Sequence, residues 1–275
     1  MKNGSSSGRL TFSRAALAAW TALVLLFLYI PIALIVVFSF NTSTLNVLWE
    51  GFTVRWYAQV WRDDPLMTAL ENSLIIATVT TLVSSALGTA AAWLLYRYRF
   101  PFTGLVRALI YFPMIVPEVI MGVSLLLLFG VMQIELGFAT VVIAHVTFCF
   151  PFVMIPVGAR LAGLDPSLEE AAMDLGATPV QAFVRVILPY LMPSIIAGAL
   201  MAFTLSIDEF VVTYFTYSAA SMTLPVKIYG MIKPGLNPTV NALSTLLVVA
   251  TIVLAVTAEF VRRLSSSPRS AKYNT

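Results

Sequence analysis

Six long runs of apolar residues constrain this chain more than any other feature of its sequence. They cover residues 15–40, 72–96, 108–134, 136–159, 186–217 and 240–261. The hydrocarbon core of a bilayer is about 30 Å thick, and a helix needs roughly 20 apolar residues to cross it. A bilayer offers no water to backbone groups, so each span must be a helix or part of a closed barrel, and runs of this length exclude barrel strands. The sequence therefore predicts an all-α, polytopic membrane protein with six transmembrane helices.

The composition supports a membrane protein and argues against other classes. Of its residues 59% are hydrophobic and 11% are charged, whereas soluble domains carry roughly 25% charged residues. The net charge of +3 is spread over short clusters beside the apolar runs, which argues against a nucleic-acid partner. The single cysteine, Cys149, lies inside an apolar run, so no intrachain disulfide can form. The lone His145 is expected to hydrogen-bond between helices, and neither a metal site nor a cofactor is predicted.

The positions of the basic residues predict how the chain is oriented. Basic residues followed by an apolar run can also mark a signal peptide, but its apolar region is only about 7–15 residues long. The first run here has 26 residues and is expected to remain as a span. Twelve of the sixteen Lys and Arg residues fall on one side of the predicted spans, which makes that side cytoplasmic. Both tails, residues 1–14 and 262–275, are therefore predicted in the cytoplasm, flanking a transmembrane domain of residues 15–261.

The connection between the fourth and fifth runs carries helix start and stop signals. Asp165 is a good N-cap, and a proline follows at the first helical position, where a missing N–H has no cost. Glu169 and Glu170 suit the positive end of the helix dipole. Gly176 supplies a C-terminal stop. A short helix at about residues 166–175 is predicted.

A second helix start follows at once. Thr178 can cap it, Pro179 takes the first position and Gln181 completes a capping box. This helix is predicted to end near Leu188, before Pro189. The whole segment can be a plain surface connection between two spans. The small and apolar residues of the first helix favour instead a helix that inserts into a cleft of a partner protein.

The same segment resembles a known coupling motif. Glu-Ala-Ala at residues 170–172, followed by Gly176, Val186, Leu188 and Pro189, has the spacing of the EAA loop of ATP-binding cassette (ABC) importer permeases, with Val186 where Ile is usual. In that family the loop docks in a groove of the ATPase subunit, and its Glu lies close to a basic residue there. The resemblance implies a type I ABC importer permease fold and gives four residues an ATPase-coupling role. These are Glu170, Ala171, Ala172 and Gly176.

The ATPase itself is expected to be another polypeptide. No GxxxxGK[ST] phosphate-binding loop is present, and none of the four lysines follows a run of glycines. No catalytic residue is predicted, so the chain is interpreted as a transport subunit and not as an enzyme.

Three acids lie within the predicted spans: Glu118, Asp208 and Glu209. An ionisable residue there costs at least about 2.5–3.5 kcal/mol on insertion scales, and no Lys or Arg lies inside a span to pair with them. Glu118 can simply sit at a helix end, and the acid pair can hydrogen-bond to neighbouring helices or mark a helix break. The functional hypothesis is a cation pathway in which carboxylates replace the hydration shell. Tyr214, after the acid pair, can add attraction between an ammonium group and its ring.

Nearly the whole chain resembles one subfamily, the putrescine and spermidine (polyamine) permeases. The resemblance is carried by RWY (55–57), ENSL (71–74), PEVIMGVSLLLLF (117–129), AHVTFC (144–149), EEAAMDLGAT (169–178), AFTLSIDEF (202–210), LPVKIYGMIK (224–233) and NPTVNALST (237–245). Polyamine permeases also carry acids at the positions of Glu118, Asp208 and Glu209. Asp is common at the first of these, and the pair is Asp-Glu here instead of Asp-Asp.

This resemblance implies partners, a location and a mechanism. It implies a second homologous permease, two copies of an ATPase and a periplasmic polyamine-binding protein, within the lipid of a bacterial inner membrane. Polyamine uptake would proceed by alternating access. Two alternatives stay open. One is an ABC permease for another small cargo, such as an amino acid, iron or another cation. The other is a proton-coupled secondary transporter, which would have no use for an EAA loop.

Overall fold

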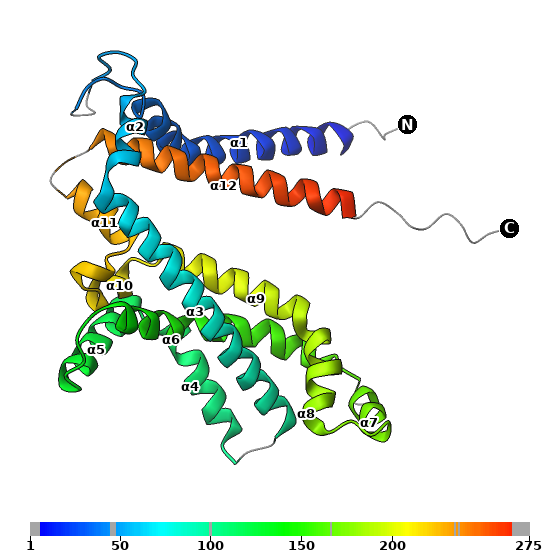
Figure 1. Cartoon of the computed structure of the whole chain (residues 1–275). Coiled ribbons are helices and arrows are strands. Elements are labelled where there is room, and N and C mark those ends of the chain that lie inside the picture. The colour runs from blue at the N-terminus through cyan, green and yellow to red at the C-terminus, as the bar shows by residue number, and fades with distance from the viewer. Residues whose placement is uncertain are drawn as a thin grey trace, which may run out of the picture. The chain divides into compact units, whose positions relative to one another are not determined.

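The computed structural model describes residues 6–44, 48–98, 101–165, 167–233, 235 and 237–265. Pro166, predicted at the first position of the loop helix, lies outside this part, as do residues 1–5 and 266–275 of the predicted tails. Every regular element in the described part is a helix, as the sequence predicts (Figure 1). The α-helices are α1 (Ser6–Phe38), α2 (Arg55–Arg62), α3 (Asp64–Arg97), α4 (Thr103–Ile115), α5 (Glu118–Val131), α6 (Phe138–Ala162), α7 (Ser167–Asp174), α8 (Pro179–Ala182), α9 (Leu188–Asp208), α10 (Val211–Thr216), α11 (Leu224–Ile232) and α12 (Pro238–Ser265). A π-helical turn, η1 (Phe183–Ile187), and a 3-10 turn, η2 (Ala219–Ser221), complete the set.

Several of these helices have the length and composition of membrane spans. Among the described residues, four helices qualify: Ala16–Phe38 within α1, α3, α6 and the continuous helix Pro179–Asp208. The pair α4 and α5 also qualifies when it is counted as one broken span, and α12 is apolar over the shorter stretch Pro238–Val253. The prediction of an all-α polytopic membrane protein is confirmed.

The chain divides into two compact units. A terminal unit comes from residues 1–64 and 230–275, and a central unit from residues 65–229. In the terminal unit, α12 contacts both α1 and α2. The apolar side chains of α1 from Leu17 onward are mostly exposed, which suits a helix surrounded by lipid or by another membrane chain. All the predicted site residues lie in the central unit.

The core of the central unit forms around α6. Its most extensive partner in this unit is α9, which lies beside it (Figure 1). A Cβ atom on Gly198 of α9 would lie only 2.7 Å from the Cα of Val153 in α6. On Gly88 of α3, a Cβ atom would lie 2.8 Å from the Phe150 carbonyl oxygen. Small residues let membrane helices approach closely, so α3 and α9 pack against α6 at distances that only glycine permits.

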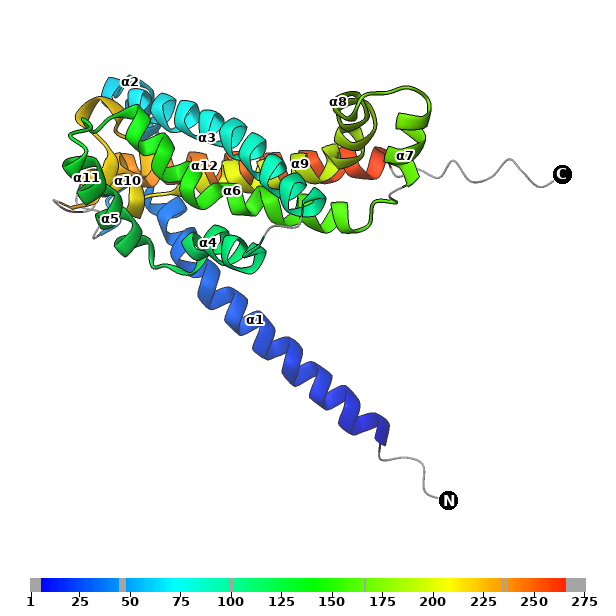
Figure 2. The same cartoon turned by 90° about the horizontal axis from the view of Figure 1, so that it is seen from below.

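The predicted span 108–134, expected to be interrupted only by Glu118, is divided between two helices, α4 and α5. The chain bends by 107° between α4 and α5, a turn that Figure 2 shows clearly. Pro117 has no N–H to donate and keeps the preceding residue out of the helical region. Val116 is accordingly extended, with φ −70° and ψ 133°. As a result, Glu118 is the first residue of a new helix.

The predicted span 186–217 is interrupted as well. α9 ends at Asp208, Glu209 is extended with φ −69° and ψ 117°, and α10 begins at Val211. This agrees with the interpretation of the acid pair as the mark of a helix break. Backbone groups freed by such a break at membrane depth need partners within the protein.

The prediction that the second loop helix ends near Leu188 is wrong. α8, η1 and α9 form one continuous helix from Pro179 to Asp208. Pro189 cannot donate to the carbonyl four residues before it, which would normally end or kink the helix. The helix widens instead, and in this π-helical turn the Leu188 N–H bonds to the Phe183 carbonyl five residues earlier.

Replacing Gly198 with alanine should destabilise the protein, because the new Cβ cannot be placed without moving the α6 backbone. Overpacking of this kind costs about 1–3 kcal/mol. Thermal unfolding can be followed with a thiol-reactive fluorophore, since the single cysteine, Cys149, is fully buried. Gly130→Ala is the matched control, because a Cβ there meets open space. Equal unfolding temperatures for the two variants would contradict the close helix contact.

Candidate functional site

The two helix breaks of the central unit meet at one cavity of about 440 Å³. The α4–α5 bend contributes Glu118, and the α9–α10 break contributes Glu209. The remaining lining is apolar, with Met121, Phe148 and Leu205 among the residues that form it. Two of the three predicted pathway acids therefore line the same space, although 91 residues separate them in the sequence.

Glu209 has a structural role in addition to its place in the cavity. Its Oε1 accepts a hydrogen bond of 2.7 Å from the Val212 N–H in the first turn of α10. The first N–H groups of a helix lack partners within it, and a negative charge is favoured there. Only 8% of Glu209 is exposed, so this carboxylate is held inside the protein as the cap of α10.

Glu118 also stands at a helix N-terminus, where the dipole favours its charge. It is the first residue of α5 and is exposed, in agreement with the interpretation that it sits at a helix end. That position does not conflict with a pathway role, because Glu118 lines the cavity at the same time.

Asp208 lies at the opposite kind of helix end. It is the last residue of α9, is exposed and is not among the residues that line the cavity. The last carbonyls of a helix lack partners and carry partial negative charge, so a carboxylate beside them is unfavourable. Helix stability therefore does not account for Asp208.

Each break places the carbonyl end of one helix beside the N-terminal end of the next, so the opposite dipole ends offset each other and the net negative charge there comes from the acids. α4 and α9 both terminate there, at Ile115 and Asp208, and their last carbonyls lack helical partners. Glu118 and Asp208 both lie near enough to Glu209 to act on it electrostatically. The region thus favours a cation and disfavours an anion.

Tyr214, predicted to line the pathway, is not among the cavity-lining residues. It belongs to an aromatic cluster on α10, with its ring centroid 5.6 Å from that of Phe210 and 5.8 Å from that of Tyr229. Its side chain keeps 42% exposure, so part of the ring stays accessible. The structure places Tyr214 on the segment after the acid pair but does not bring it into the cavity.

A buried histidine ties the second break to α6. His145 bonds through Nδ1 to Ser206 Oγ and through Nε2 to Thr213 Oγ1, both at 2.7 Å. The Thr213 hydroxyl donates in turn to the Glu209 carbonyl at 3.0 Å. With that proton used, Thr213 accepts from Nε2–H, and Nδ1 accepts from the Ser206 hydroxyl. The prediction of His145 as a hydrogen-bond partner between helices is confirmed, and the network holds the backbone of Glu209 in place.

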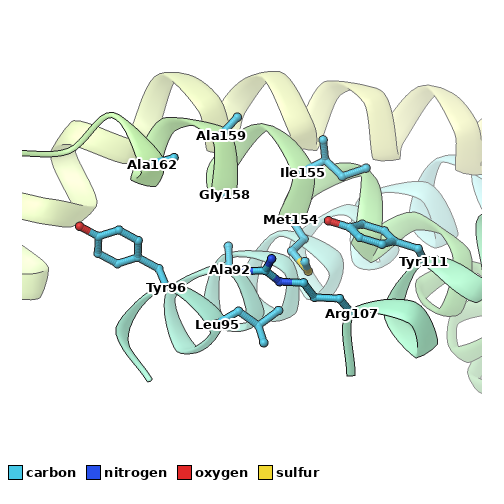
Figure 3. Close-up of a pocket in the computed structure, with 10 residues that line it drawn as sticks. All are labelled: Ala92, Leu95, Tyr96, Arg107, Tyr111, Met154, Ile155, Gly158, Ala159 and Ala162. Carbon is cyan, nitrogen blue, oxygen red and sulfur yellow. The ribbon is translucent and has the colours of Figure 1, made fainter. Parts of the chain in front are cut away.

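A second cavity, of about 270 Å³, lies between α3, α4 and α6. Arg107 of α4 extends into it, and the Tyr96 and Tyr111 rings flank the space (Figure 3). No acid lines this cavity, and its one charged group is a cation. Its chemistry is therefore opposite to that of the first cavity, and it does not suit a cationic ligand.

The predicted loop helix is present as α7, and its N-terminal cap forms as expected. The Asp165 carboxylate accepts a hydrogen bond of 3.0 Å from the Ser167 N–H. Hydrogen bonds from Ser167 hold the pKa of Asp165 below its usual value. The cap is therefore present at neutral pH and weakens only as the pH falls through that lowered pKa.

The C-terminal stop and the second start also form as predicted. Gly176 has a φ of +88°, a conformation that favours glycine. Its N–H bonds to the Met173 carbonyl, and the next N–H bonds to the Ala172 carbonyl, which is the Schellman pattern. Thr178 and Gln181 then make the reciprocal bonds of a capping box. Together, α7 and the first turn of α8 form a defined hairpin at one end of the central unit (Figure 2).

The outer surface of this hairpin suits contact with another protein. Glu170 and Ala171 are exposed, and Ala172 is partly exposed. Leu175 and Val180 are large apolar residues that are 90% and 72% exposed. An acid, small residues and exposed apolar side chains in one place are typical of an interaction surface.

Glu169 has a role beyond the one predicted from the sequence, which was an interaction with the helix dipole. Its side chain is 8% exposed and pairs with Arg97 at the end of α3, with Nη1 and Oε2 3.0 Å apart. The two residues lie 72 positions apart, and nothing in their local spacing indicates the pair. Neighbouring acids of α7 therefore differ: Glu169 faces the protein, and Glu170 is exposed.

Broken helices around an acidic cavity, with a capped hairpin outside the spans, define a membrane-embedded transport subunit. Its fold is that of ABC importer permeases. It matches a chain of a bacterial alginate ABC transporter, crystallised with a periplasmic protein bound to alginate pentasaccharide. The TM-score is 0.70 and the identity 16%, over 94% of this chain and 97% of that one. The chain belongs to the family of binding-protein-dependent transport system inner membrane components, whose model matches residues 84–267.

Curated relatives cover most of this chain. The spermidine/putrescine transport system permease protein PotC of Escherichia coli K12 is 40% identical over 237 residues, which is 86% of this chain and 90% of the relative. The putrescine transport system permease protein PotI of the same strain is 42% identical over 239 residues, covering 83% and 85%. The chain is thus a multi-pass permease subunit of an ABC importer, and ATP hydrolysis belongs to a separate subunit.

Replacing His145 with leucine should lower the unfolding temperature, because the buried Ser206 and Thr213 hydroxyls would lose their partner. Each buried polar group left without a partner costs about 1–3 kcal/mol. Thiol exposure at Cys149 reports the transition. Thr147→Val on the same helix is the control, since this hydroxyl bonds only to the carbonyl four residues earlier. If both variants unfold like the parent chain, the network does not stabilise the break.

Proposed function

We propose that this permease subunit forms part of the membrane pathway for polyamine uptake. The observation that carries the proposal is the convergence of Glu118 and Glu209, from two helix breaks, on one cavity. The names of the relatives PotC and PotI, which are spermidine/putrescine and putrescine permeases, support the same cargo. Membership of a binding-protein-dependent family disfavours a proton-coupled secondary transporter.

The chemistry of the cavity matches a polyamine better than a compact metal ion. Polyamines carry ammonium groups separated by methylene chains. Carboxylates can neutralise the ammonium groups, and the apolar side chains of Met121, Phe148 and Leu205 can contact the methylenes without losing hydrogen bonds. Charge attraction in a partly dry pathway exceeds the roughly 1 kcal/mol that two unit charges 4 Å apart share in bulk water.

Asp208 is assigned to the same pathway, outside the cavity. It is exposed next to the carbonyl end of α9, where negative charge accumulates without stabilising the helix. Tyr214 on α10 offers an accessible ring face to an ammonium group that moves past the break. The three acids and this tyrosine would then act in succession along the path of the cation.

The exposed face of the α7 hairpin is assigned to the ATPase. Glu170 would make the charge contact, and Ala171, Ala172 and Gly176 would allow close approach. A complete transporter would combine this chain with a second homologous permease, two ATPase copies and a periplasmic polyamine-binding protein. Both termini would be cytoplasmic, on the ATPase side. ATP-driven closure of the ATPases would then move the hairpins and switch the pathway between outward-open and inward-open states.

Neutralising the pathway acids should reduce cation passage more than folding. Asp208→Asn and Glu118→Gln should each lower putrescine or spermidine uptake by at least several-fold, because attraction is lost while volume is kept. Glu209→Gln should do the same without unfolding α10, since its amide oxygen can still accept the Val212 N–H. Uptake of radiolabelled polyamine by cells, corrected for the amount of protein in the membrane, measures the effect.

The control for this series is Glu135→Gln, an exposed acid in the connection between α5 and α6 that does not line the cavity. Basal ATPase activity should be retained in every variant. Uptake equal to wild type in all three pathway variants would show that the acids are structural and would remove the physical support for a polyamine cargo.

Docking can be tested separately on the hairpin. Leu175→Asp should weaken association with the ATPase, because it puts a charge where an exposed apolar side chain meets the partner. Gly176→Trp should do so by adding bulk and by straining a residue at φ +88°. Co-purification of the ATPase in detergent is the measurement, with Leu175→Met as the apolar control. A complex that stays intact with unchanged ATP-dependent uptake would refute the docking assignment.

A further inference from the structure

The coupling hairpin is connected to a long helix of the central unit by an ion pair. Arg97 is the last residue of α3, and Glu169 lies in the first turn of α7. Their Nη1 and Oε2 atoms are 3.0 Å apart, which is the distance of a charge-assisted hydrogen bond. The backbone of α7 otherwise packs mainly against α8 and η1, the start of the continuous helix that ends at Asp208. The ion pair therefore adds a link from the hairpin to a different helix.

Burial of Glu169 makes this ion pair costly to break. The side chain of Glu169 is 8% exposed and that of Arg97 is 42% exposed. A carboxylate that is removed from water needs a charged partner. Separating Glu169 from Arg97 would therefore leave a buried charge unpaired, which costs free energy. When α7 moves, Arg97 is expected to move with it, or the pair has to break. An exposed ion pair would not have this property, because water would replace either partner.

The other end of α3 is attached to the segment that follows α10. Asn72 donates from Nδ2 to the carbonyls of Ala220 and Met222, both at 3.0 Å. One residue further on, Ser73 Oγ accepts from the Leu224 N–H at 2.8 Å. At 1.5 Å per residue, the helix between Asn72 and Arg97 is roughly 37 Å long. One rigid helix thus connects the coupling hairpin to the polypeptide beyond the cavity break.

We propose that the Arg97–Glu169 ion pair is the positioning contact that transmits movement of the coupling hairpin to α3, and through α3 to the segment after α10. Arg97 and Glu169 are then positioning residues for transport, and neither touches the cargo. The inference rests on the proposed function of α7 as the ATPase-docking element. The inference gives the two neighbouring acids of that helix different partners: Glu170 faces the ATPase, and Glu169 faces the permease.

The test uses the assembled transporter in liposomes, with its ATPase, its partner permease and its binding protein. Arg97→Glu and Glu169→Arg should each lower uptake per ATP hydrolysed by roughly five-fold or more, the size of a typical coupling between sites. Assembly of the complex and basal ATPase activity should stay close to wild type. The double variant Arg97→Glu with Glu169→Arg restores opposite charges and should recover most of the lost coupling.

Two further variants separate transmission from packing. Arg97→Met with Glu169→Met keeps a filled contact without charge and should leave the complex assembled but poorly coupled. Arg185→Gln, at an exposed cation of η1, is the control for a change of charge near the hairpin. The proposal is overturned if the single variants couple like wild type, if the charge swap brings no recovery, or if the double Met variant couples fully.

Failure of the proposed function has a different signature. If the wild-type complex hydrolyses ATP in response to its binding protein but takes up no polyamine, the cargo assignment fails. The charge-swap comparison can then still be read from ATPase activity stimulated by the binding protein. If instead the wild-type chain does not associate with an ATPase at all, the docking assignment fails, and the Arg97–Glu169 inference fails with it.

Discussion

The absence of water in a bilayer decides how this protein can be built. Backbone groups there must find partners inside the protein, so the chain is helical wherever it crosses the membrane. At the α9–α10 break, side chains bond to backbone groups that the interrupted helix leaves free. Glu209 accepts the Val212 N–H at the start of α10, and Thr213, held by His145, donates to the Glu209 carbonyl. Polar residues that look like candidates for function alone thus also bond to the backbone groups at the break.

The three acids differ in the kind of helix end at which they stand. Glu118 and Glu209 stand at helix N-termini, where their charges stabilise α5 and α10. Asp208 stands at a C-terminus, where its charge works against the helix. The first two acids therefore have a structural role at their helix ends, and Asp208 has none there. Because the breaks meet, Glu118 and Glu209 line one cavity.

Close packing and helix caps shape the rest of the central unit. Glycines at α3 and α9 let both helices approach α6 closely. The hairpin of α7 and the first turn of α8 has its own caps, at Asp165, Gly176 and Thr178. The Arg97–Glu169 ion pair connects this hairpin to the end of α3.

The sequence by itself determined the membrane class, the all-α fold and the caps of the hairpin formed by α7 and the first turn of α8, because these depend on local properties. Run length decides whether a helix can span, and caps act within one turn, so Asp165, Gly176 and Thr178 were readable in order along the chain. Only the tertiary structure decided the bend at Val116, the continuation of the helix past Pro189 and the convergence of Glu118 with Glu209. A proline can end, kink or widen a helix, and the surrounding packing selects among these outcomes. The partner of Glu169 could not be read from the sequence for the same reason, since an ion pair between residues 72 positions apart exists only once the end of α3 is brought near α7.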